Sequence, residues 1–195
     1  ISGVSHIYSN NWAFAALKAD GSVVVWGPDS HPYILSAVAN QLNSGVSQIF
    51  STRAAFAALK ADGSVVTWGN YQVGGSSSAV ASQLSSDVLQ VFSTWSAFAA
   101  LKADGSVVTW GDTGSGGNSS AVASLLSSGV SQIFSTFTDF AALKADGSVV
   151  TWGTAHAGGD SSAVATQLSF GVSHIASTEG AFAALKVDGS VVAWG

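Results

Sequence analysis

A block of 42 residues recurs along this chain without insertion or deletion, and it constrains the fold more than any other feature of the sequence. A tryptophan followed by glycine recurs at this interval, at Trp26, Trp68, Trp110, Trp152 and Trp194. Such periodicity is typical of repeat architectures, in which each unit buries its apolar surface against the next unit. We therefore expect a single domain over 1–195 that consists of repeats 3–44, 45–86, 87–128, 129–170 and 171–195.

The second unit illustrates the secondary structure that we expect in each repeat. Runs of β-branched and aromatic residues at 45–52, 56–60 and 65–69 predict three short strands. Asp62 and Gly63 form a hairpin-turn signal between the second and third runs, so the strands should be antiparallel. The loop 70–78 is polar and glycine-rich, and 79–84 can form one or two helical turns. Ser77 or Ser78 would be the N-cap of these turns, with Val80 and Leu84 on one face.

The expected strands are apolar on both faces, which indicates burial on both faces. Stacking each small sheet between its neighbours achieves this, and such a sheet is the blade of a β-propeller. We therefore expect an all-β fold, a β-propeller of five three-stranded blades with short helical turns in the linkers between blades. The repeated tryptophans and phenylalanines should pack between blades. The five blades either close into a ring or form an arc of a larger propeller.

The composition argues against several classes of function. The chain has no cysteine, so it has neither a disulfide framework nor thiolate chemistry. The net charge is −5, and five of the six basic residues are the evenly spaced lysine of the repeat, which leaves no basic stripe for nucleic acid. No apolar run approaches the roughly 18 residues of a membrane helix. The chain opens in mid-pattern and has no methionine, so we interpret it as a segment of a longer protein.

The motif FAALKADGSVVTWG at 56–69, followed by Gly74 and Gly75, resembles the repeat of the regulator-of-chromosome-condensation family in its short-blade bacterial form. The resemblance covers all five units and implies a β-propeller, usually seven-bladed. Members of this family serve as nucleotide-exchange factors, as ubiquitin-ligase modules and as a secreted bacterial β-lactamase inhibitor, so the resemblance implies a related range of functions. The insertion used for nucleotide exchange has no counterpart here. The histidine that the family carries before the second strand is replaced by Ala13, Ala55, Ala97, Asp139 and Ala181.

Two segments differ from unit to unit, namely the turn after the first strand and the loop after each Trp-Gly pair. Because the three strands alternate in direction, both segments should lie at one side of the blades, with the constant Asp-Gly turns at the other. Loops on a rigid scaffold often carry function, and Trp, Tyr and Arg are frequent interface anchors. We expect partner binding on this variable face by Asn11, Trp12, Tyr33, Arg53, Tyr71, Trp95, Phe137 and Glu179. The alternative is drift at solvent-exposed turns.

These features favour a non-enzymatic module that binds a protein partner, in a secreted or cell-surface protein. A glycan-binding propeller and a structural spacer in a large surface protein are the alternatives. Near-identical pockets in every unit would indicate glycan binding, but the variable face differs at every blade. The absence of cysteine suits an extracellular protein and a cytoplasmic one equally.

The sequence offers little to bind a metal or to carry catalysis. His6 and His174 occupy a position held by glutamine in the other units, and in a closed ring they would approach each other as weak metal candidates. Polar residues that line a channel are the simpler interpretation. We therefore expect neither a cofactor nor a metal. Four further polar residues fall on the variable face without a spacing that pairs a nucleophile with a base: His31, Asp139, His156 and Glu179.

The repeated lysine and aspartate, such as Lys60 and Asp62, are expected to form a ring of charge pairs at the constant face. Exposed pairs of this kind stabilise a protein by only about 0–1 kcal/mol each.

Overall fold

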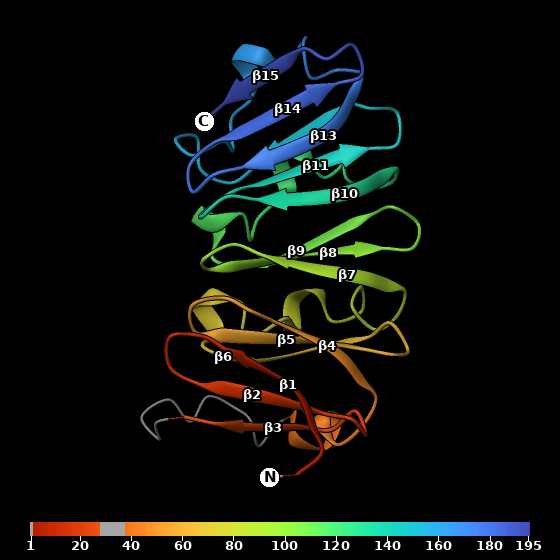
Figure 1. Cartoon of the computed structure of the whole chain (residues 1–195), viewed down its shortest axis with the longest axis vertical. Helices are drawn as coiled ribbons and strands as arrows, with labels where there is room; N and C mark the ends of the chain where they lie inside the picture. Colours follow the sequence, from red (N-terminus) through yellow and green to blue (C-terminus); the bar gives the residue numbers. More distant parts are fainter. Residues whose placement is uncertain (1, 28–37) are drawn as a thin grey trace.

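The computed structural model describes residues 2–27 and 38–195. These residues form fifteen strands in five antiparallel sheets of three, with one sheet in each repeat. We number the sheets as blades 1 to 5 along the chain. The blades lie one upon another along the long axis of the molecule (Figure 1). The predicted all-β fold of five three-stranded blades is confirmed.

The strands agree with the expected positions to within one or two residues. Blade 1 contains β1 (Val4–Ser9), β2 (Phe14–Lys18) and β3 (Val23–Trp26). Blade 2 contains β4 (Val46–Ser51), β5 (Ala55–Lys60) and β6 (Val65–Gly69). Blade 3 contains β7 (Val88–Ser93), β8 (Ala97–Lys102) and β9 (Val107–Gly111). Blade 4 contains β10 (Val130–Ser135), β11 (Phe140–Lys144) and β12 (Val149–Trp152), and blade 5 contains β13 (Val172–Ser177), β14 (Phe182–Lys186) and β15 (Val191–Trp194).

The linkers contain short 3-10 helices. Four of them overlap the helical turns expected at 79–84 and at the equivalent positions, namely η1 (Ala39–Leu42), η3 (Ser78–Val80), η5 (Ser120–Val122) and η6 (Ser162–Val164). The other two, η2 (Tyr71–Val73) and η4 (Thr113–Ser115), lie in segments that were expected to be loops. Leu84 is buried and Val80 packs against the same core, as predicted. Ser77 is the N-cap residue of η3, as predicted, but its side chain makes no capping hydrogen bond. No helix in the described part of the chain is long and apolar enough to cross a membrane.

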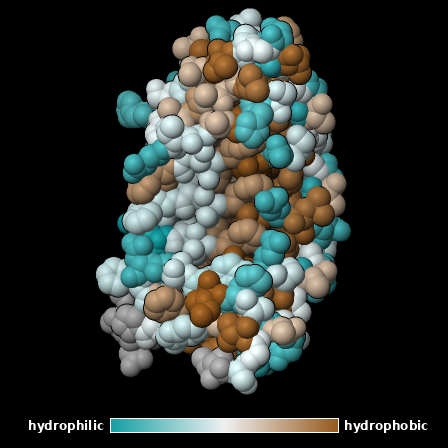
Figure 2. All heavy atoms as spheres, viewed as in Figure 1, coloured by the Kyte–Doolittle hydropathy of each residue, from teal (hydrophilic) through white to brown (hydrophobic). Residues whose placement is uncertain are grey.

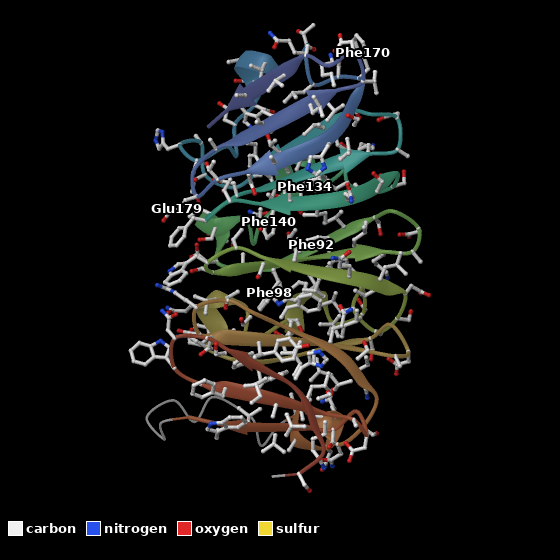
Figure 3. All side chains as sticks on the ribbon, in the orientation of Figure 1. Phe92, Phe98, Phe134, Phe140, Phe170 and Glu179 are labelled. Carbon is white, nitrogen blue, oxygen red and sulfur yellow. The ribbon has the colours of Figure 1, made fainter. Side chains whose placement is uncertain are left out.

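The hydrophobic core is divided into four clusters, each between two neighbouring blades. In the cluster between blades 2 and 3, Ala57 and Leu59 of β5 meet Phe98 and Trp110 of blade 3. The Phe98 and Trp110 rings stack with 5.2 Å between their centroids. Figure 3 shows Phe98 and Phe140 between successive blades. The repeated aromatic pair therefore forms the contact between blades, as predicted.

The stack of blades is open, with the N-terminus near one end and the C-terminus near the other (Figure 1). His6 in β1 and His174 in β13 are therefore far apart, and the pairing considered for a closed ring does not form. The aromatic pair of blade 1 is also an exception to the predicted burial, since Phe14 and Trp26 are 46% and 40% exposed. Within residues 2–27 and 38–195, no blade packs against the outer face of blade 1.

Candidate functional site

In blades 2 to 4, hydrogen bonds join the two variable segments of the blade at one side of the stack. The Asn70 N–H donates to the Ala54 carbonyl at 2.9 Å, and the Thr52 hydroxyl donates to the Val73 carbonyl at 2.9 Å. This side is at the left of Figure 1. In blade 5, β13 and β15 run toward it and β14 runs away from it. In blades 2 to 4 both variable segments therefore share one face, as predicted.

A ladder of backbone hydrogen bonds connects the turns of all five blades on this face. Each donor N–H and acceptor carbonyl belong to equivalent positions in successive blades, with N···O distances of 2.8–3.1 Å. We call these five residues the variable row: Asn11, Arg53, Trp95, Phe137 and Glu179. The ladder uses only main-chain atoms, so it holds five different side chains at one regular spacing.

The side chains of the variable row are exposed and chemically varied. Trp95 and Phe137 stand at its centre, with 4.9 Å between the ring centroids and 22° between the ring planes. They are 37% and 39% exposed, so each presents much of its surface to solvent. Arg53 lies before this aromatic pair, and Glu179 follows it at the edge of the stack (Figure 3). After Asn11, the row thus runs from the positive charge of Arg53 through two aromatic rings to the negative charge of Glu179.

Two other predicted residues lie beside the variable row. Trp12 follows Asn11 and is 52% exposed. Its backbone N–H donates to Oδ1 of Asn10 at 2.9 Å. Tyr71 is exposed at the start of η2, next to Asn70, whose N–H bonds to the turn of Arg53 and Ala54. Tyr33 and His31 lie outside the described residues. The structure therefore brings seven of the eight predicted partner-binding residues to one face.

Asp139 is a correction to the predicted variable face, because it is fully buried. The Thr154 N–H and hydroxyl both donate to its Oδ1, the hydroxyl at 3.0 Å. The hydroxyls of Thr138 and Thr136 donate to its Oδ2 at 3.0 and 3.2 Å. The carboxylate thus links the two variable segments of blade 4 by side-chain bonds. Three threonines from two separate segments bond to the buried carboxylate, and the spacing of acidic residues did not indicate them.

At the opposite side of the stack, each Asp-Gly-Ser turn is closed by its aspartate. Asp20 Oδ1 accepts hydrogen bonds from the Ser22 hydroxyl at 2.6 Å and the Ser22 N–H at 3.0 Å. These bonds, with the help of Lys18, lower the pKa of Asp20 to about 2. The equivalent serine bonds also lower the pKa values of the other four turn aspartates: Asp62, Asp104, Asp146 and Asp188.

The predicted ring of lysine–aspartate pairs is wrong in most blades. Among the described residues the only ion pair joins Lys18 and Asp20, at 3.2 Å. Lys102, Lys144 and Lys186 instead donate to carbonyls of the preceding linkers at 2.8–3.0 Å. These three lysines therefore connect blades 3, 4 and 5 to the linkers before them.

The first strands form a further exposed surface along the stack, facing the viewer in Figure 1. The third residue of each first strand is polar and exposed: His6, Gln48, Gln90, Gln132 and His174. Figure 2 shows hydrophobic and hydrophilic residues along this face. Residues 2–27 and 38–195 contain no group of three or more His, Cys, Asp or Glu side chains that could hold a metal ion.

Comparison with known proteins finds similarity in structure alone. No protein-family model matches the chain, and no curated protein sequence matches it either. Among solved structures, yeast RCC1 (Prp20), determined in complex with Kap60, matches with a TM-score of 0.59 and 17% identity over 98% of this chain and 56% of that chain. Human WBSCR16 matches with a TM-score of 0.56 and 19% identity over 98% of this chain and 61% of that chain.

The CRINKLY WD40 ectodomain of the Arabidopsis thaliana receptor kinase ACR4 also matches, with a TM-score of 0.54, 15% identity, and coverage of 98% of this chain and 68% of that chain. This chain thus spans a little over half to about two thirds of these structures. Their similarity establishes an RCC1-like β-propeller fold for the blades. At this level of identity it establishes the fold alone.

Proposed function

We propose that this chain is a non-enzymatic interaction module that binds a protein partner along the variable row. The observation that carries the proposal is the backbone ladder from Asn11 to Glu179, because it fixes five different side chains in one ordered line. A surface made of independent flexible turns would lose more conformational entropy on binding. The variable row is held in place before any partner arrives.

The chemistry of the row defines the partner that would fit it. Trp95 and Phe137 offer an apolar surface of the kind that forms interface hot spots. Arg53 and Glu179 lie on either side of this pair and carry opposite charges. We therefore propose a partner segment with a central apolar residue, an acidic residue toward Arg53 and a basic residue toward Glu179. Complementary charges of this kind set orientation more than affinity.

The solved relatives support a protein partner. One yeast structure contains RCC1 together with Kap60, and another describes the binding properties of Prp20p to Gsp1p and histones. The RCC1-like fold and the repeated Asp-Gly and Trp-Gly pairs also support placing these repeats in the RCC1 family. A glycan-binding function receives less support, since the row presents a different side chain in each blade.

A peptide-display selection against the immobilised protein tests the proposal, with a glycan array in parallel. The test variant is the double substitution Trp95→Ser and Phe137→Ser. The matched control is Leu125→Ser and Phe170→Ser, which removes two exposed hydrophobic side chains away from the row. Circular dichroism and thermal unfolding establish that both variants are folded.

We expect selected peptides to bind the wild type and the control alike, and to bind the row variant about 30-fold more weakly or not at all. Charge reversal at Arg53 and Glu179 together should then select peptides of the opposite polarity. Equal binding by the row variant would overturn the proposal. Selective binding of glycans but no peptides would favour a lectin-like function instead.

A further inference from the structure

We propose that this chain binds neutral saccharide units in pockets beside its linkers, at a surface separate from the variable row. The pocket of blade 3 has a volume of about 520 Å³ and is lined by residues 80–83 of one linker, 117–127 of the next and 107–109 of β9. We call it the linker pocket. None of its lining residues belongs to the variable row, so this inference does not depend on the proposed function.

Neutral polar side chains of the linker pocket have hydrogen-bonding capacity left for a ligand. The Thr109 and Ser119 hydroxyls lie 3.0 Å apart and bond to each other, which holds the linker against β9. The Ser120 hydroxyl and the side-chain NH2 groups of Gln83 and Asn118 make no hydrogen bond within residues 2–27 and 38–195. All three side chains are exposed, so their donors and acceptors can reach a bound molecule.

The charged groups of the linker pocket are already engaged by the chain and have opposite signs. The Lys102 ammonium donates to the Gln83 carbonyl at 2.8 Å. Asp104 accepts bonds from the Ser106 N–H at 2.9 Å and from the Ser106 hydroxyl at 2.6 Å. Lys102 and Asp104 are the two charged residues among the described residues that line the pocket. Strong binding of a phosphate or carboxylate uses charge-assisted bonds from several cationic donors, so this pocket fits a neutral ligand better.

Apolar side chains lie next to these polar groups. Val80 belongs to one linker, Leu126 to the next, and Val107 and Val108 to β9. Val108 and Leu126 are buried in the core, which fixes the shape of the pocket. A pyranose ring carries hydroxyl groups around its edge and C–H groups on its faces, so it matches a lining with both kinds of surface. A cavity of this volume with a few orienting polar groups is typical of small-molecule sites.

The lining of the linker pocket recurs in the two neighbouring blades. Shifted by 42 residues, it is the same in blade 2 except that Ser76 replaces Asn118. In blade 4 the differences are Leu125 in place of Gln83 and Asp160 in place of Asn118. The sequence therefore provides three closely similar linings in successive blades.

The hydrogen bond that shapes the pocket recurs as well. The hydroxyl of Thr67 donates to that of Ser77 at 3.1 Å in blade 2, and the hydroxyl of Thr151 donates to that of Ser161 at 2.9 Å in blade 4. Near-identical pockets in successive units are the feature that we expected of a glycan-binding propeller, and the variable face does not have them. A rigid series of weak sites binds a glycan of several equivalent units with high avidity.

Substitutions that fill the pocket provide the test. The pocket variant replaces one exposed lining alanine in each of three blades by leucine: Ala81→Leu, Ala123→Leu and Ala165→Leu. The matched control places leucine at the exposed alanines two positions earlier, outside the lining: Ala79→Leu, Ala121→Leu and Ala163→Leu. Circular dichroism and thermal unfolding establish that both variants are folded. Binding is measured on an array of immobilised neutral and charged oligosaccharides, with the free neutral oligosaccharides as competitors.

We expect the wild type and the control to bind at least one neutral glycan alike, and the pocket variant to bind it about 30-fold more weakly or not at all. The row variant Trp95→Ser and Phe137→Ser should bind this glycan as the wild type does, which separates the site from the proposed function. Equal binding by the pocket variant would overturn the proposal. Binding of charged glycans alone, or of no glycan at all, would overturn it too.

A variant with leucine in blade 3 alone, Ala123→Leu, tests whether the site is repeated. We expect it to weaken binding to the immobilised glycan about tenfold, because the pockets of blades 2 and 4 remain. Filling all three pockets should then remove the rest of the binding. A loss in Ala123→Leu as large as that in the triple variant would contradict the repeated site.

Discussion

Trp95 and Phe137 are joined twice, through their backbones and through their side chains. The Trp95 N–H donates to the Phe137 carbonyl at 2.8 Å, and the two rings stack with 4.9 Å between their centroids. These residues are 42 positions apart and belong to different blades. Their contact shows how the repeat converts separate turns into one surface.

A double-mutant cycle on Trp95→Ala and Phe137→Ala should measure this ring contact. We expect each substitution to lower the free energy of unfolding by only about 1 kcal/mol, with a coupling of about 0.5–1.5 kcal/mol between them. The losses stay small because both rings are partly exposed and the ladder itself is main chain. Urea unfolding provides the measurement. A coupling of zero would mean that the rings do not stack in solution.

Phe98→Ala and Phe14→Ala compare one repeat position in two environments. Phe98 is fully buried between blades, whereas Phe14 is 46% exposed on the outer side of blade 1. We expect Phe98→Ala to lower the free energy of unfolding by about 3–5 kcal/mol, and Phe14→Ala to lower it by less than about half as much. Urea unfolding of both variants provides the measurement. Equal losses would indicate that blade 1 is covered in the monomer.

Asp139→Ala should leave the free energy of unfolding unchanged or raise it by about 1 kcal/mol, because a buried carboxylate is costly to desolvate. Alanine occupies this position in the other blades, where a backbone bond such as Asn70 N–H to Ala54 carbonyl joins the same segments. Thr154 can form that bond to Thr138 once the carboxylate is gone.

The control for this prediction is Thr154→Val, which removes one donor and keeps the buried carboxylate. Thermal unfolding should show a loss of about 1–3 kcal/mol for this variant. A larger loss for Asp139→Ala than for Thr154→Val would contradict our interpretation of the aspartate as replaceable.

The turn aspartates predict a loss of stability in acid. Their pKa values are lower in the folded chain than in the unfolded chain, and that of Asp20 is about 2. Stability from these groups is therefore complete above their unfolded pKa and declines as pH falls through the folded pKa, between about pH 4 and pH 2. Thermal unfolding at a series of pH values measures this decline.

Replacing the turn serines removes the main cause of the pKa shift. A variant with alanine at Ser22, Ser64, Ser106, Ser148 and Ser190 should show a shallower decline over this pH range, since the hydroxyl bonds to the aspartates are gone. Ser85→Ala is the control, because this hydroxyl bonds to a backbone carbonyl. An unchanged decline in the five-serine variant would argue against the turn aspartates as its source.

The repeat period alone predicted most of the fold, because strand-forming runs and Asp-Gly turns recur in register. It also placed the variable turns on one face, since the direction of each strand follows from the hairpin. The ladder of the variable row was not predictable from side chains, because main-chain atoms 42 residues apart form it. Whether the blades close into a ring depends on small angles between blades, which the sequence pattern does not encode.

The errors have local causes. Asp139 belongs to a polar turn, and its burial follows from three threonine hydroxyls that surround it. Lys102 was expected to pair with the nearby Asp104, but the aspartate already accepts two bonds from Ser106, and the lysine reaches the Gln83 carbonyl. For Lys102, a hydrogen bond to a carbonyl replaced the charge pair expected from sequence. For Asp139, bonds to hydroxyls accompany the burial of a residue that was expected on the variable face.

Amide hydrogen exchange at the five positions of the variable row is the most direct test of the surface on which the proposed function depends. In dilute protein, the N–H groups of Asn11, Arg53, Trp95 and Phe137 should exchange slowly, because each donates to the next blade. The N–H of Glu179, at the end of the ladder, should exchange quickly. Rapid exchange at all five positions would show that the turns are independent and that no continuous row exists.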